Sequence, residues 1–201
     1  MIITSFFTPN YSGEEAAFLS AAEKYARPGD IIQVHAVDSR GSWRLNCGMK
    51  PAHILDVLVQ GKQPVLWVDI DGRFRSAWDL NLDVDFAAWF IPNRKMQPAH
   101  VPGGSGTGHD GIASGTMWFN HTDKAIEFLQ SWFLAERGQG QWEQQILGEV
   151  WYKWDESGGG LKTKRLHQRY CKVFDCQWFD GKGPVVIEHM QASRRLKRGR
   201  G

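Results

Sequence analysis

The sequence is poor in cysteine, in long apolar runs and in net charge. Its three cysteines, Cys47, Cys171 and Cys176, are an odd number without a CxxC pair, which argues against a disulfide framework and against a zinc ribbon. No stretch approaches the ~18 consecutive apolar residues of a membrane span, and the first ten residues lack the basic start and long apolar segment of a signal peptide. These absences predict a cytoplasmic protein that has no membrane partner.

Apolar residues, by contrast, are plentiful. They make up 42% of the 201 residues and include ten tryptophans, enough for a genuine core, which excludes wholesale disorder. The length suits one globular domain, or one domain with a tail. We therefore expect a single folded domain over residues 1–193, followed by a flexible tail over residues 194–201.

The formal net charge of +2 hides an uneven distribution of charged residues. Five arginine and lysine residues and no acidic residue follow position 193, and removing them from the 24 basic residues leaves 19 against 22 acidic ones. A mildly acidic body therefore carries a basic tail. This tail is either a frayed, soluble terminus or an arm that binds the phosphates of a polyanion.

The order of the first elements predicts a parallel α/β sheet. Residues 2–7 form a β-branched and aromatic run that is typical of a buried strand. Ser12 and Glu15 have the spacing of a capping box, so we expect a helix from about residue 13, which Pro28 and Gly29 end. Residues 30–37 form the next predicted strand. A strand, a helix and a second strand in this order indicate a parallel sheet covered by helices.

The rest of the chain continues this alternation. The pattern predicts helices over 50–60, 122–136 and 141–154, and strands over 64–68, 85–91 and 114–120. Tryptophans on the two later helices are expected to pack into the core, namely Trp132, Trp142, Trp151 and Trp154. The glycine-rich stretch 103–108 lacks the lysine of a phosphate-binding loop. It is either a mobile lid or acceptor loop, or a plain connector.

Two carboxylates, Asp69 and Asp71, directly follow the apolar strand at 64–68. The carboxyl edge of a parallel sheet is where open α/β folds bind their ligands. Neighbouring anions repel each other, and a bound divalent cation would offset this repulsion. Oxygen ligands favour magnesium or manganese over zinc. The alternative is a pair of solvated aspartates at the end of a strand.

Several segments, in this order and spacing, resemble the nucleotide-sugar-dependent glycosyltransferases of the GT-A fold, especially their small bacterial or virus-encoded members. The matching segments are IITSFFT at 2–8, SRGSW at 39–43, VLWVDID at 65–71, SGTMWFN at 114–120, WEQQIL at 142–147 and VIEHMQASR at 186–194. The resemblance implies an α/β fold: one GT-A, Rossmann-like domain with a mostly parallel central sheet flanked by helices. If the chain is viral, its compartment would be the host cytoplasm.

The resemblance also implies a metal-dependent transfer from a nucleotide-diphosphate sugar, with Mn²⁺ or Mg²⁺ as cofactor and a UDP-sugar as the expected donor. It makes Asp71 a direct metal ligand, and it places Asp69 against the ribose or the water shell of the metal. A histidine near the C-terminus completes the metal shell in many relatives, a role that falls to His189. The alternative for His189 is a surface or packed histidine.

Other matching positions are implied to bind the donor. The family uses the loop after the first strand for the base and ribose, and it places the start of the 114–120 strand beside the sugar. From their chemistry, basic residues of 39–50 could offset phosphate charge, an aromatic residue there could stack on a base or sugar, and an arginine after His189 has the forked geometry for phosphate. In this sequence those residues are Thr8, Tyr11, Arg40, Trp43, Lys50, Ser114, Gly115 and Arg194. Ordinary surface residues are the alternative for Arg40, Trp43 and Lys50, and a glycine that merely ends the preceding loop is the alternative for Gly115.

An inverting enzyme of this fold needs a general base to accept the proton of the acceptor hydroxyl. Glu143, in the matching WEQQIL segment, is the first candidate, and Asp110 is the second. Glu143 could equally be a carboxylate that simply favours a helix N-terminus. Retaining enzymes of the fold often show no obvious base, so the stereochemical outcome stays open.

The acceptor is the least determined part of the prediction. The tail and the basic residues near it, together with small virus-encoded relatives, favour a hydroxymethylated pyrimidine base in DNA. A surface glycan or a protein hydroxyl is the alternative acceptor. Two other functions fit the D-x-D pair, a phosphatase of the haloacid-dehalogenase type and a non-catalytic module that binds a nucleotide sugar. The sequence does not predict an oligomeric state.

Overall fold

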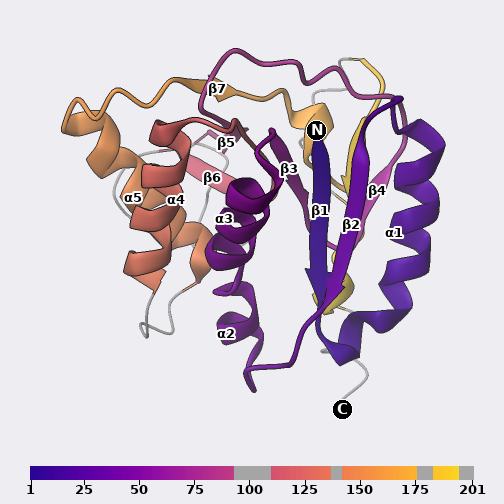
Figure 1. The fold of residues 1–201 in the computed structure, drawn as a ribbon. Coiled ribbons are helices and arrows are strands. Elements are labelled where there is room, and N and C mark those ends of the chain that lie inside the picture. Colours follow the sequence, from indigo (N-terminus) through magenta and orange to yellow (C-terminus); the bar gives the residue numbers. More distant parts are fainter. Residues whose placement is uncertain (93–109, 137–141, 176–182, 195–201) are drawn as a thin grey trace.

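The computed structural model describes residues 1–92, 110–136, 142–175 and 183–194. A six-stranded sheet lies at the centre of the molecule, with the strand order β2-β1-β3-β6-β5-β7 (Figure 1). Its strands are β1 (Ile2–Phe7), β2 (Ile31–Ala36), β3 (Val65–Val68), β5 (Phe86–Ile91), β6 (Gly111–Phe119) and β7 (Thr163–Arg165). Neighbouring strands pair in parallel except at β6, which runs antiparallel to both β3 and β5. The mostly parallel sheet predicted from the sequence is therefore confirmed.

Helices cover both faces of this sheet. Helix α1 (Ser12–Tyr25) lies on one side, and α3 (Lys50–Gly61), α4 (Asp123–Glu136) and α5 (Glu143–Glu156) lie on the other (Figure 1). Successive strand residues point to opposite faces. In β3, Val65 and Trp67 accordingly join the core under α3, α4 and α5, whereas Leu66 and Val68 join the core under α1. Burial on both faces explains why β3 appears in the sequence as a continuous apolar run.

A second, three-stranded sheet extends the α1 side. It has the order β4-β9-β8, formed by β4 (Gly72–Phe74), β8 (Lys172–Val173) and β9 (Ile187–His189). Strand β4 begins immediately after the D-x-D pair and pairs antiparallel with β9, so that Gly72 lies opposite His189. A residue near the C-terminus is thereby carried to the end of β3.

The predicted helices and strands agree with the structure to within a few residues, but the capping box is wrong. Ser12 is the first residue of α1 and has helical backbone angles, because a 3-10 turn, η1 (Pro9–Tyr11), directly precedes it. The residue at the N-cap position is Tyr11, and it makes no side-chain capping hydrogen bond. The glycine-rich stretch 103–108, Cys176 and residues 195–201 of the predicted tail lie outside the described residues.

The tryptophan predictions divide into two groups. Trp132 and Trp151 are buried, as expected, and Trp154 is half-buried against the same core. Trp142 does not belong to that core: it is the N-cap residue of α5 and lines a cavity. The four-residue spacing of apolar residues continues to Trp142, one position before the first helical residue, Glu143.

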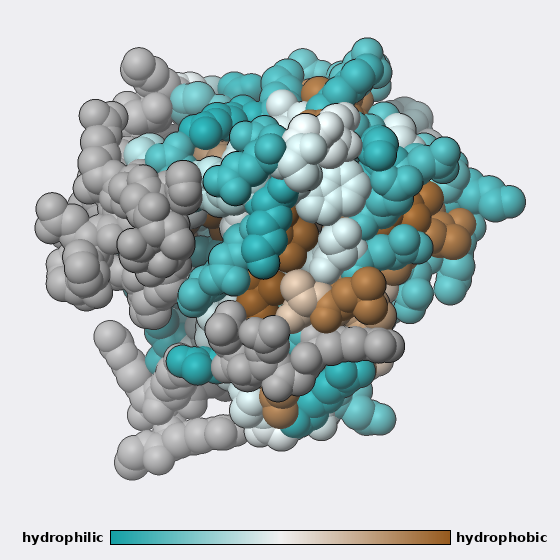
Figure 2. Space-filling model, turned by 90° about the vertical axis from the view of Figure 1, so that its left-hand side faces the viewer, coloured by the Kyte–Doolittle hydropathy of each residue, from teal (hydrophilic) through white to brown (hydrophobic). Residues whose placement is uncertain are grey.

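Outside the grey residues, hydrophilic side chains predominate on the face seen from the α4 and α5 side, and hydrophobic ones show between them in separate patches (Figure 2). Leu134 of α4 is the most exposed large apolar side chain among the described residues, at 60%. Within the described chain, every helix is too short or too polar to cross a membrane.

Candidate active site

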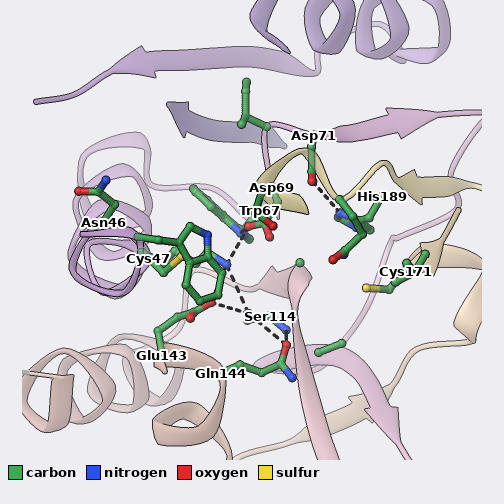
Figure 3. Close-up of a pocket in the computed structure, with 18 of the residues that line it drawn as sticks. Asn46, Cys47, Trp67, Asp69, Asp71, Ser114, Glu143, Gln144, Cys171 and His189 are labelled. Atoms are coloured by element: carbon green, nitrogen blue, oxygen red, sulfur yellow. Dashed lines mark hydrogen bonds and ion pairs between the residues drawn. The ribbon is translucent and has the colours of Figure 1, made fainter. Parts of the chain in front are cut away.

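A cavity of about 640 Å³ opens at the edge of the central sheet where β1 and β3 end. The chain beyond both strands lines it, through Thr8 after β1 and through Asp69 and Asp71 after β3 (Figure 3). Because β6 runs antiparallel, its first half reaches this same edge and contributes Ser114 and Gly115. The predicted ligand edge of the sheet is therefore a real concavity.

The backbone of the D-x-D turn is tightly held. The N–H of Asp69 donates to the carbonyl oxygen of Gly115 at 2.8 Å, and the N–H of Gly72 donates to the carbonyl oxygen of Asp69 at 2.7 Å. A Cβ atom on Gly72 would lie 2.9 Å from that same carbonyl oxygen, closer than non-bonded atoms can approach. The glycine after the two aspartates is thus required by the turn that presents them.

His189 lies against the D-x-D pair. Its Nδ1 is 3.5 Å from Asp71 Oδ1, its Nε2 shares a 2.8 Å hydrogen bond with the hydroxyl of Thr116, and the residue is only 3% exposed (Figure 3). A Cβ atom on Gly115 would lie 3.0 Å from the imidazole Cε1. Gly115 in β6 therefore makes room for the ring. This explains a glycine that the sequence allowed to be either a site residue or the end of a loop.

The charges of this group depend on one another. Burial lowers the pKa of His189, but the adjacent Cys171 and Asp71 outweigh it and raise the pKa to about 10. Burial raises the pKa of Asp71, but His189 and the N–H of Ala192 outweigh burial, so the pKa lies below its usual value. The Ala192 N–H donates to Asp71 Oδ2 at 2.8 Å. Without a cation, the proton on His189 balances the Asp71 carboxylate.

Asp69, Asp71 and His189 each offer a ligand atom, and these atoms all lie within 4.8 Å of one another. Two carboxylates and one imidazole form a donor set that suits a divalent first-row ion such as Mn²⁺. Such an ion needs neutral imidazole as its ligand, so its binding would displace the His189 proton. The residues present therefore fit the metal that the sequence implies.

A buried cation, Lys50, links the D-x-D pair to α5. Its Nζ lies 2.8 Å from Asp69 Oδ1 and 2.8 Å from Glu143 Oε1, and the residue is 5% exposed. Burial disfavours a charged ammonium, but the two carboxylates outweigh it, so the pKa of Lys50 is raised above its usual value. Lys50 therefore remains charged and is bound to both carboxylates.

Glu143 is the first residue of α5 and is 1% exposed. Its Oε1 accepts from Lys50 Nζ and from the Ser114 hydroxyl, each at 2.8 Å. Its Oε2 is buried and has no hydrogen-bond partner among the described residues. A carboxylate at a helix N-terminus is favoured by the helix dipole, and here it also lines the cavity (Figure 3).

No protein-family model and no curated protein sequence matches this chain. Among solved structures, it is similar to one described as a glycosyltransferase involved in the glycosylation of the major capsid of PBCV-1. The TM-score is 0.69 at 12% sequence identity, over 98% of this chain and 97% of that one. The fold is that of a glycosyltransferase. The fold class expected from the sequence resemblance is confirmed over almost the whole chain.

In this glycosyltransferase fold, most of the predicted donor-binding residues line one cavity. Thr8 is 2% exposed, and its hydroxyl has no hydrogen-bond partner among the described residues. Arg194 also lines the cavity and forms an ion pair with Asp175. The full set of predicted positions along the cavity is Thr8, Tyr11, Trp43, Lys50, Asp69, Asp71, Ser114, Gly115, Glu143, His189 and Arg194.

Two predicted site residues lie elsewhere. Arg40 is exposed and outside the cavity lining, where its backbone N–H donates to Asn46 Oδ1 at 2.7 Å. Asp110 is also outside the lining and forms a 2.5 Å ion pair with Arg165. Of the two acidic residues considered as general base, only Glu143 is brought to the cavity.

The structure adds site residues that the sequence did not assign to the site. Gln144 accepts from the backbone N–H of Ser114 at 3.3 Å, and Thr116 holds the imidazole of His189. Trp142 lines the cavity beside Trp43, with ring centroids 6.1 Å apart. Thr116 could have been found from strand periodicity, because it lies two residues after Ser114 and therefore on the same face of β6.

Proposed function

We propose that this protein is a metal-dependent glycosyltransferase that moves a sugar from a nucleotide-diphosphate sugar to a hydroxyl group. The observation that carries the proposal is the convergence of Asp69, Asp71 and His189 within 4.8 Å at the cavity of a glycosyltransferase fold. A phosphatase of the haloacid-dehalogenase type would use the same aspartates on a different fold, so the fold match favours transfer of a sugar over phosphate hydrolysis.

Asp71 and His189 would hold Mn²⁺ or Mg²⁺ directly, and Asp69 would complete the shell or contact the ribose. A metal bound there would neutralise charge on the diphosphate as it leaves. Asp69 is well placed to contact the metal shell or the ribose, because Lys50 and the Trp67 Nε1–H both bind the same one of its oxygens, Oδ1. The Trp67 contact is 3.0 Å long.

The remaining cavity residues divide between the two ends of a sugar nucleotide. Thr8 and Tyr11, just after β1, are suited to the base and ribose, and UDP is the expected nucleotide. Arg194 offers a forked cation for the diphosphate, and its partner Asp175 is an exposed carboxylate that phosphate could replace. Ser114 and Gly115 lie where the sugar would follow the diphosphate into the cavity.

Glu143 is the proposed general base for the acceptor hydroxyl. Its Oε1 is bound by Lys50 and Ser114, so the proton would go to Oε2, which is buried and has no hydrogen-bond partner in the described part of the chain. The Lys50 ammonium pairs with this buried carboxylate at 2.8 Å. The alternative role is a fixed hydrogen-bond acceptor for a donor-sugar hydroxyl, which a retaining enzyme would also need.

A hydroxymethylated pyrimidine base in DNA is the proposed acceptor. Its support is the basic tail together with exposed Lys164 and Arg165 on the edge strand β7. The similar solved structure is described as acting in capsid glycosylation, so a protein-linked or surface glycan is the second candidate. Binding to DNA through phosphate contacts would weaken steeply with added salt, and salt-independent binding would argue for the glycan.

The proposed function is tested by a screen of nucleotide sugars against candidate acceptors, with Mn²⁺ present or removed by a chelator. We expect one donor to give a hexose mass increment on one acceptor class with Mn²⁺, and transfer to fall at least about a hundredfold in the chelator because the diphosphate loses its counter-charge. Phosphate release from small phosphoesters without any sugar transfer would support the phosphatase instead. Donor binding without turnover of any acceptor or of water would support the non-catalytic module.

A further inference from the structure

Arg73, the residue after the D-x-D-G turn, forms hydrogen bonds to the backbone on both sides of Asp71. Its Nη1 donates to the carbonyl oxygen of Ile70 at 3.1 Å and to the carbonyl oxygen of Gly72 at 2.9 Å. These two carbonyls flank the residue whose carboxylate faces His189. A planar guanidinium presents its donors in a fixed geometry, so Arg73 defines the path of the backbone through Asp71.

The guanidinium is itself held from α1. Its Nη2 forms an ion pair with Glu14 Oε2, and both side chains are mostly buried, at 13% and 14% exposed. The surrounding packing is firm, since Phe18 of α1 contacts Phe74 of β4 edge-to-face at 5.8 Å. Glu14 therefore connects the first helix to the metal-binding turn across 59 residues of sequence.

Arg73 does not contact a ligand in the cavity. Arg73 is absent from the cavity lining, whereas Ile70, whose carbonyl it binds, and the next residue, Asp71, belong to that lining. Its guanidinium binds two backbone carbonyls and Glu14, and the side chain is 13% exposed. Arg73 would therefore affect the binding of the metal and the donor only through the position of Asp71.

We propose that Arg73, anchored by Glu14, is a positioning residue that sets the Asp71 carboxylate for the metal. This inference rests on the proposed function, because it assigns Asp71 to a divalent ion. Residues that orient a metal ligand without touching the metal commonly change its affinity by about 10- to 100-fold when replaced. The Arg73–Glu14 pair meets that description through the two carbonyls that flank the ligand.

The test is the Mn²⁺ affinity of the full chain, measured by electron paramagnetic resonance in the absence of any sugar nucleotide. We expect Arg73→Gln to raise the Kd for Mn²⁺ at least about tenfold. Arg73→Lys, which keeps the charge but cannot span both carbonyls and Glu14, should raise it about threefold or more. Arg27→Gln is the matched control: Arg27 is 40% exposed and pairs with Asp30, both residues lie outside the cavity lining, and its change should leave the Kd unaltered.

Thermal unfolding of the metal-free variants separates positioning from a purely structural role. A structural role would lower Tm without changing the Mn²⁺ Kd of the folded protein, and that result would overturn the inference. If Arg73→Gln does not fold, Arg73→Lys decides, and an unchanged Kd overturns the inference in the same way. Absence of Mn²⁺ binding by the unsubstituted protein would instead remove the metal site of the proposed function, and this inference with it.

Discussion

Replacing Asp71 with asparagine is expected to lower kcat/KM for nucleotide-sugar turnover by about a thousandfold. The carboxylate is the member of the D-x-D pair that faces His189 directly, and it accepts the Ala192 N–H through its second oxygen. An asparagine of the same size removes the negative charge and turns one oxygen into a donor. Loss of several kcal/mol of charge stabilisation by a metal corresponds to a rate change of this size.

Asp56→Asn is the matched control for this experiment, because Asp56 is an exposed carboxylate on α3, outside the cavity lining. It should leave kcat/KM within about twofold of the unsubstituted protein. Steady-state rates at saturating Mn²⁺, with circular dichroism to verify folding, give the comparison. An Asp71→Asn variant that keeps turnover within tenfold would contradict the role assigned to this carboxylate.

Replacing Lys50 with methionine is expected to cost about 3–5 kcal/mol of unfolding free energy. Methionine fills much of the same volume, but it leaves Glu143, which is 1% exposed, with only the Ser114 hydroxyl as hydrogen-bond partner at Oε1. An uncompensated carboxylate in that position is costly because it is removed from water. Urea unfolding at pH 7 measures the change.

Two further variants show whether the loss comes from the buried charge. Adding Glu143→Gln to Lys50→Met removes the orphaned charge, and the double variant should regain a substantial part of the lost stability. Lys124→Met removes an ammonium from an exposed pair with Glu127, and it should change stability by less than about 1 kcal/mol. If Lys50→Met costs no more than Lys124→Met, the ion pair with Glu143 does not carry the stability described above.

Most of the fold follows from local sequence patterns. Strands β1, β3 and β5 are buried on both faces; β3 and β5 appear as unbroken apolar runs, and β1 as a β-branched and aromatic run with Thr4 and Ser5 inside it. The D-x-D pair could be recognised because it lies directly after such a strand, at the edge where α/β folds bind ligands. The fold class and the central pair of carboxylates were therefore predictable from the sequence.

Local sequence patterns do not predict the contacts that complete the site, because these contacts join distant parts of the chain; only the family resemblance pointed to His189 as a partner of the D-x-D pair. Lys50 meets Glu143 across 93 residues, and His189 reaches Asp71 only because β9 pairs with β4. Local periodicity also misled at Trp142, where the helical pattern runs on into the N-cap. Arg73 gave no periodic signal, since its role depends on backbone carbonyls and on a partner in α1.

The site can be understood as two coupled charge clusters at one sheet edge. Lys50 joins Asp69 to Glu143, and His189 joins Asp71 to Thr116. The D-x-D pair therefore has a cation partner on each side before any ligand arrives. Lys50 and His189 each favour the charged form of the carboxylate beside them, although burial leaves the pKa of Asp69 above its usual value. A metal that bridges a diphosphate would favour the charged form of both carboxylates further.

Nucleoside diphosphate binding tests the central claim most directly, because it needs neither the sugar nor the acceptor to be known. Isothermal titration calorimetry with UDP, GDP, dTDP and ADP would be run in Mn²⁺ and again in a chelator. We predict that at least one diphosphate binds at least about tenfold more tightly with Mn²⁺ and that Asp71→Asn abolishes the difference. Equal affinities with Mn²⁺ and with chelator for every diphosphate would contradict a metal-bridged donor site at Asp69, Asp71 and His189.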